Sequence, residues 1–183
     1  MRGFHYHVDL KSHDPNRQLP NHIEMIRHGW EESIHVTLRL LSYALLYEEN
    51  LQINGRPLNE DAPYQPSFGK WNLQGQIEVW GECEPDDFKR IKKIATKTPA
   101  SRWIISVSSQ LQAEQAKAAL KRNKLRKDRF KIVYFEEELV QEMSEQFERK
   151  NALTWIHGEF NPPVLQFDFN GLWFDSTFGV MEY

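Results

Sequence analysis

Apolar and polar residues along the chain first predict a strand and then a long helix. Residues 4–10 alternate strictly and predict the strand. Residues 30 to about 49 change to helical periodicity. One apolar stripe of this segment consists of Trp30, Ile34, Leu38, Leu41 and Leu45. Further apolar residues widen the stripe, so we expect the helix to be buried on most of its circumference.

The middle of the chain predicts a layer of parallel strands connected by helices. Apolar runs alternate there with amphipathic segments, an order typical of right-handed crossovers between parallel strands. We expect strands at 76–83, 102–109 and 130–135, and helices from residue 85, over 110–125 and over 136–147.

The remaining segments complete the predicted fold. Residues 54–69 contain Asn54-Gly55 and three prolines, which predicts a long loop of the kind found over functional clefts. Residues 151–159 and 164–174 predict antiparallel strands, with Asn170-Gly171 as a hairpin turn. The expected class is therefore α/β or α+β, a mixed sheet flanked by helices, with residues 1–183 as a single domain.

Composition indicates a packed protein in a reducing compartment. Hydrophobic residues make up 40% of the chain, with six Trp and eleven Phe, which favours a folded core over disorder. Cys83 is the sole cysteine, so an intramolecular disulfide is excluded. The amino end has no apolar signal segment and no run is long enough to cross a membrane, so we expect a cytoplasmic location.

Charge is distributed unevenly along the chain. The formal net charge is −3, yet residues 89–131 contain 14 Lys and Arg against two acidic residues. Such a segment could present a positive face to DNA or RNA. The alternative is that amphipathic helices carry solvated lysines there without a partner.

Acidic residues lie within the strand predicted at 76–83. Side chains two apart share a face, which places Glu78, Trp80, Glu82 and Glu84 together and leaves Ile77, Val79, Gly81 and Cys83 for the core. At ~3.3 Å per residue, Glu82 and Glu84 lie roughly 7 Å apart, and Glu78 lies about 13 Å from Glu82. The acids could flank a cation such as Mg²⁺. Equally, they could pair with the lysines and arginine of residues 89–93.

Two segments resemble the YaeQ family. RHGWEESIHVTLRLLSYALLYEENLQI resembles a signature in which R-H-P-S-E leads into a helix with L-R-L-L. Its matching residues are Arg27, His28, Glu31, Leu38, Arg39, Leu40 and Leu41. GQIEVWGECEPDDFKRIKK resembles the family's W-I-E-V-G strand followed by R-(I/L)-(K/R)-K. Its matching residues are Glu78, Trp80, Glu82, Arg90, Ile91, Lys92 and Lys93. The resemblance extends over residues 27–156.

This resemblance implies a variant of the PD-(D/E)xK nuclease core, a restriction-endonuclease-like fold with acids at one sheet edge. It implies Mg²⁺ or Mn²⁺ held by Glu31, Glu78 and Glu82, with Lys92 or Lys93 positioning the attacking water. Such an ion activates water and neutralises a scissile phosphate. The candidate contacts to nucleic acid are Arg27, His28, Arg39, Lys89 and Arg90.

Two functions remain open at this stage. The first is a metal-dependent phosphodiesterase, although Glu84 occupies the lysine position of the acid-x-lysine pattern. The second is a non-catalytic module that binds nucleic acid or protein, with its acids paired to Arg39, Lys92 and Lys93. They are distinguished by whether Glu31, Glu78 and Glu82 meet at one cavity with free oxygens.

Overall fold

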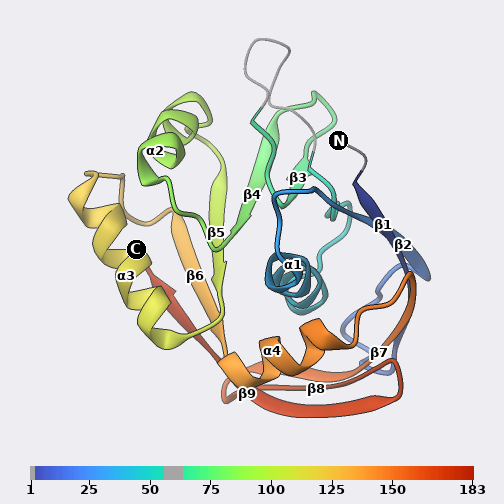
Figure 1. Cartoon of the computed structure of the whole chain (residues 1–183). Coiled ribbons are helices and arrows are strands. Elements are labelled where there is room, and N and C mark those ends of the chain that lie inside the picture. Colours follow the sequence, from blue (N-terminus) through green and yellow to red (C-terminus); the bar gives the residue numbers. More distant parts are fainter. Residues whose placement is uncertain (1–2, 56–63) are drawn as a thin grey trace.

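The computed structural model describes residues 3–55 and 64–183, and these contain one curled sheet with helices on its faces (Figure 1). The strands are β1 (Phe4–Ser12), β2 (His22–Arg27), β3 (Phe68–Trp71), β4 (Ile77–Cys83), β5 (Arg102–Val107), β6 (Phe130–Phe135), β7 (Lys150–Phe160), β8 (Pro163–Phe169) and β9 (Leu172–Glu182). The helices are α1 (Ser33–Leu45), α2 (Phe88–Lys97), α3 (Gln110–Arg122) and α4 (Glu137–Glu145). The strand order is β2-β1-β7-β8-β9-β6-β5-β4-β3.

The predicted parallel layer is confirmed by β4, β5 and β6, which pair in parallel. Helices α2 and α3 make the crossovers and lie side by side on one face of this layer (Figure 1). Their apolar residues Ile91, Ile94 and Leu120 pack with Trp80 and Trp103 of the sheet. The mixed sheet flanked by helices is therefore the fold that the periodicity predicts.

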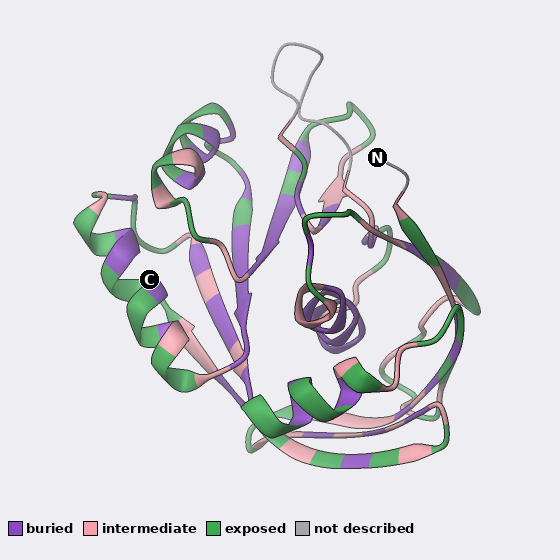
Figure 2. Cartoon of the chain, in the orientation of Figure 1, coloured by how far each residue is buried: buried purple, intermediate pink, exposed green. Residues whose placement is uncertain are grey.

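The opposite face of the sheet curls around α1. Figure 2 shows this helix as an almost entirely buried rod at the centre of the molecule, and every residue from Val36 to Leu45 is buried. Helix α1 packs on α4 and on β2, β4 and β5. A polar contact joins α1 to β5, from the Ser42 hydroxyl to the Ser106 hydroxyl at 2.6 Å. The expected burial on most of the helix circumference is thus confirmed.

The carboxyl-terminal strands form the predicted antiparallel hairpin. Asn170 and Gly171 both have positive φ angles, 54° and 84°, in the turn between β8 and β9. Strand β9 then continues beyond β8 and pairs with β6 through Phe178–Glu182. This one strand therefore joins the two halves of the sheet. No helix in the described ranges has the length and apolar character needed to cross a membrane.

The observed elements differ from the predicted ones in three places. Residues 22–27 form β2, which pairs with β1 and was not predicted. Helix α1 begins at Ser33 rather than Trp30, and Trp30 is 77% exposed instead of buried on the apolar stripe. The loop predicted at 54–69 ends in β3 at Phe68, and its residues 56–63 lie outside the described part of the chain.

On β4 the expected core face is confirmed, since Ile77, Val79, Gly81 and Cys83 are buried, but the expectation for the other face is wrong. Trp80 and Glu82 were expected on an acidic, open face, but α2 covers that face as α1 covers the other. Trp80 is fully buried and stacks on Trp103 with ring centroids 5.2 Å apart. Of Glu78, Trp80 and Glu82, only Glu78 is exposed. The carboxylate of Glu82 is therefore a buried charge that needs a partner.

Candidate functional site

A cavity of about 640 Å³ lies between the start of α1 and the end of β4. Its carboxylates are those of Glu31, Glu82, Glu84 and Asp86. Its other polar and aromatic side chains include His28, Trp30, His35, Arg39, Tyr64, Cys83 and Arg90. The sequence separates these groups by up to 62 positions, and the fold brings them to the carboxyl edge of the parallel strands.

Local sequence explains how the walls are built. Strand β4 ends where Glu84 takes a positive φ of 43° and Pro85 follows. Asp87 then caps α2, because its side chain accepts a hydrogen bond from the Arg90 amide at 2.9 Å. This turn directs Arg90 back toward the cavity at the first turn of the helix.

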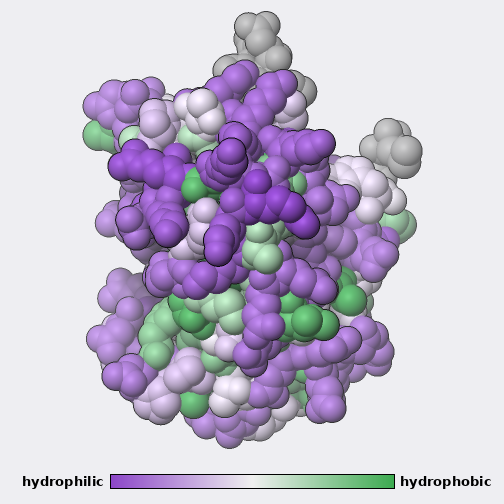
Figure 3. Space-filling model, turned by 90° about the vertical axis from the view of Figure 1, so that its left-hand side faces the viewer, coloured by the Kyte–Doolittle hydropathy of each residue, from purple (hydrophilic) through white to green (hydrophobic). Residues whose placement is uncertain are grey.

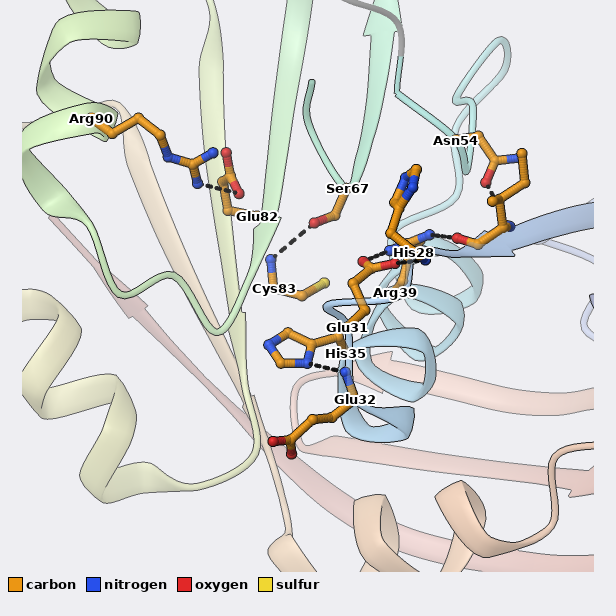
Figure 4. A network of polar contacts seen from close by, with 11 residues as sticks. His28, Glu31, Glu32, His35, Arg39, Asn54, Ser67, Glu82, Cys83 and Arg90 are labelled. Atoms are coloured by element: carbon orange, nitrogen blue, oxygen red, sulfur yellow. Dashed lines mark hydrogen bonds and ion pairs between the residues drawn. The ribbon is translucent and has the colours of Figure 1, made fainter. Parts of the chain in front are cut away.

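The carboxylate of Glu31 is buried and fully engaged. One oxygen accepts from the His28 amide at 2.8 Å, and the other pairs with the Arg39 guanidinium. Arg39 also donates to the Ile26 carbonyl at 2.8 Å (Figure 4). This pair therefore fastens the turn before α1 to both the helix and the end of β2.

The carboxylate of Glu82 is engaged in the same way on the other wall. Its Oε1 accepts from the Trp80 indole at 2.8 Å. Its Oε2 accepts from Arg90 at 3.3 Å (Figure 4). Burial raises the pKa of this carboxyl, and the neighbouring Arg90 charge opposes that rise only in part. Burial of the charged Glu82 carboxylate is therefore unfavourable, and the hydrogen bonds from Trp80 and Arg90 offset part of that cost.

The three predicted metal ligands are not brought together. Glu31 and Glu82 line one cavity, but Glu78 is exposed near the start of β4, where Lys70 of the edge strand β3 is 3.9 Å away. Glu78 does not reach the cavity because it lies four residues before Glu82, near the start of β4, and only the far end of the strand borders the cavity. The predicted convergence of all three carboxylates is wrong.

A divalent cation does not fit this donor set. All four oxygens of Glu31 and Glu82 already accept from a protein donor. Among residues 3–55 and 64–183, no group of three or more His, Cys, Asp or Glu is arranged to hold a metal. A hard cation needs several oxygen ligands, and an ion here would compete with Arg39 and Arg90 for the oxygens that these arginines already hold.

The predicted lysines and nucleic-acid contacts lie in several places. Lys89, Lys92 and Lys93 are exposed on α2 and do not line the cavity. Arg39 is 4% exposed, and its guanidinium is held by Glu31 and by the Ile26 carbonyl, so its contact with nucleic acid stays a prediction. The three others are Arg27, beside the Phe4 ring, His28, stacked on Trp30, and Arg90, paired with Glu82.

Cys83 also lines the cavity, but its thiol is not activated. Burial raises its pKa to about 12, so it stays protonated near neutral pH. Sequence reasoning missed Trp30 and Tyr64 as parts of this site. The available signal for Trp30 was Gly29 before it and two glutamates after it, because acidic residues mark a helix start and so place that start after the indole.

Comparisons with known proteins agree on the family. The family model described as "YaeQ protein" matches residues 3–158. The crystal structure of YaeQ protein from Xanthomonas axonopodis pv. citri is similar with a TM-score of 0.75 at 15% identity, covering 98% of each chain. That of YaeQ protein from Pseudomonas syringae gives 0.74 at 15% identity, covering 100% of this chain and 96% of the other. No curated protein matches.

Proposed function

The chain belongs to the YaeQ family, and from that premise we propose that it binds nucleic acid on the outer face of α2 and α3, without metal-dependent hydrolysis at its buried glutamates. The observation that carries the proposal is a set of exposed basic side chains on these helices and the loop after α3. We call this set the basic face: Lys89, Lys92, Lys93, Lys97, Lys117, Lys121, Arg122, Lys124, Arg126 and Lys127.

The charges of the basic face are not balanced by the protein. Within the described residues, none of its side chains lies within 4.0 Å of a carboxylate, whereas the partly buried arginines Arg39 and Arg90 are each paired. Unbalanced like charges repel one another and lower stability, which a polyanionic partner reverses. Figure 3 shows that this side of the molecule, with α2 and α3 toward the viewer, is strongly hydrophilic over its upper half.

The fold holds the two helices together as one platform. Arg129 donates to the carbonyls of Thr98 at 2.6 Å and Ser101 at 3.1 Å, and so ties the end of α2 to the loop after α3. Burial lowers the pKa of Arg129, and the adjacent charge of Arg126 lowers it further. Basic residues from both helix ends are therefore kept close in a fixed arrangement, as contacts to successive phosphates require.

Fluorescence anisotropy with a labelled duplex tests this proposal. The paired change Lys117→Glu with Lys121→Glu should weaken binding by about tenfold or more at low salt, since phosphate contacts carry non-specific affinity. The control Arg149→Glu with Lys150→Glu makes the same change in net charge beside β7, away from both helices. Equal effects of the two pairs, or no binding by the unmodified protein, would overturn the proposal.

A metal-dependent phosphodiesterase is the second candidate function. It is favoured by Glu31 and Glu82 reaching one cavity from two elements, as the resemblance implies. Incubation of single- and double-stranded DNA and RNA with Mg²⁺ or Mn²⁺ distinguishes the two candidates. We expect intact substrate. Cleavage that disappears with EDTA and in Glu82→Gln would establish the hydrolase instead.

A further inference from the structure

An exposed aromatic pair stands at the mouth of the cavity. Trp30 is 77% exposed, and its ring is parallel to that of His28, with centroids 5.7 Å apart and planes 1° from each other. Trp30 is not used in the core, where the sequence pattern placed it. His28 supports the indole on one side, while most of its surface is left to solvent. Flat aromatic surfaces of this kind stack with nucleobases.

The aromatic residues that line the cavity opening lie next to the basic face. Tyr64 lines the same cavity, and the Nζ of Lys93 lies 5.7 Å from the centre of its ring. Arg90 also lines the cavity and belongs to the first turn of α2. A nucleic-acid strand that leaves the cavity past Tyr64 therefore meets Lys93 and then the other lysines of α2. Residues 117–127, the densest part of the basic face, contain no aromatic residue, so aromatic side chains come from elsewhere in the fold.

The charge inside the cavity distinguishes a base from a phosphate. Glu84 and Asp86 add two carboxylates that have no ion-pair partner among the described residues. Together with the paired Glu31 and Glu82 they disfavour an entering phosphate. A neutral base is not repelled, and its exocyclic amino groups can donate to carboxylate oxygens.

We infer that the cavity receives an unpaired base of single-stranded nucleic acid, which stacks on Trp30 while the phosphates follow the lysines of α2. This inference rests on the proposed function and adds the substrate class. A duplex keeps its bases stacked and paired, so it reaches the basic face but not the cavity mouth. Preference for single strands therefore depends on Trp30, whereas affinity for any nucleic acid depends on the basic face.

Trp30→Ala tests the inference in the full-length protein. Binding of labelled 15-nucleotide single strands, as DNA and as RNA, should weaken by about 5- to 150-fold, the range given by loss of one stacked base. Duplex binding should not change. The matched control is Trp173→Ala, which removes a second exposed tryptophan, on β9 and 53% exposed, that does not line the cavity. Trp30→Phe should restore most of the single-strand affinity.

The possible failures can be told apart. If Trp30→Ala and Trp173→Ala bind single strands equally well while the charge reversals in α3 still weaken duplex binding, the stacking inference is overturned and the proposed function stands. Absence of binding to every nucleic acid overturns both. Equal loss of single-strand and duplex binding in Trp30→Ala also contradicts the inference, and unchanged circular dichroism confirms that this variant is folded.

Discussion

The guanidinium of Arg39 pairs with the carboxylate of Glu31 inside the protein, where both side chains are no more than 5% exposed. Arg39 lies on α1 and Glu31 in the turn before it, so the pair determines how the chain enters the central helix. A residue that the family resemblance implies as a metal ligand is thus held by a structural ion pair.

Removal of Arg39 should strongly destabilise the fold. Arg39→Ala leaves the Glu31 carboxylate buried without its partner and the Ile26 carbonyl without its donor. The expected loss in the free energy of unfolding is about 3–5 kcal/mol. Urea denaturation measures it.

The control is Arg102→Ala, because Arg102 pairs with Glu48 at 2.8 Å on the surface, where its side chain is 66% exposed. That change should cost less than about 1 kcal/mol. Combining Arg39→Ala with Glu31→Gln should recover part of the loss, since the isolated buried charge is gone. Equal costs for Arg39→Ala and Arg102→Ala would contradict the structural importance of the buried pair.

Glu82→Gln should stabilise the protein at neutral pH. The amide keeps an acceptor for the Trp80 indole and removes a charge that is expensive to bury, while Arg90 is partly exposed and can be solvated. Replacing buried ion pairs by neutral groups is often neutral or stabilising. We expect a gain of up to about 1 kcal/mol at pH 7 by urea denaturation.

The gain in stability from Glu82→Gln should increase as pH rises. The pKa of Glu82 is raised in the folded protein, so the folded state binds its proton more tightly than the unfolded chain does. The unmodified protein therefore loses stability relative to Glu82→Gln as pH rises above the ordinary glutamate pKa of about 4.3. Near pH 4 the difference should be smallest. A difference that grows toward low pH would contradict the raised pKa.

Gly81→Ala should destabilise the sheet through overpacking. A Cβ at this position would lie 2.4 Å from the ring of Phe68, which is fully buried on the neighbouring β3. Overpacking of this kind costs about 1–3 kcal/mol. Thermal unfolding should show a lower Tm, and adding Phe68→Leu should restore part of it. No change in Tm on Gly81→Ala would mean that the ring has room to move.

Divalent cations should leave stability unchanged. Mg²⁺ or Mn²⁺ at millimolar concentration should not shift Tm in the unmodified protein, since the oxygens of Glu31 and Glu82 already have donors. Surface binding is controlled by repeating the titration with Glu82→Gln. A rise in Tm that this variant abolishes would show that the metal displaces Arg90 and would favour the hydrolase.

Hydrophobic periodicity correctly predicted the strands that are buried on both faces and the helices that have one apolar side. The parallel strands β4 to β6 and their helices follow from apolar runs and amphipathic stripes, and these are local signals. Strand β2 was missed although Ile23 and Met25 alternate with polar residues, because the segment lies in a polar region. Trp30 was misplaced because its four-residue spacing from Ile34 fits a helix that in fact begins at Ser33.

The site was only partly predictable for a different reason. Sequence indicated that Glu31 and Glu82 would meet, and the cavity contains both. It offered ion pairs to Arg39 and to the basic residues 89–93 only as an alternative, and it could not select Arg39 for Glu31 and Arg90 for Glu82, since each pair is eight residues apart across a change of backbone direction. Nor did it indicate that Trp30 and Tyr64 share a cavity mouth. Pairings of this kind depend on tertiary geometry rather than on local pattern.

The most direct test of the central claim is the dependence of nucleic-acid affinity on salt. Binding of a labelled duplex should weaken linearly in a plot of log affinity against log salt, with a slope of about −3 or steeper, as several phosphate contacts require. The slope should become shallower by about one for each basic-face residue lost that contacts a phosphate, and should not change with Arg149→Glu and Lys150→Glu. A flat response to salt would contradict binding through the basic face.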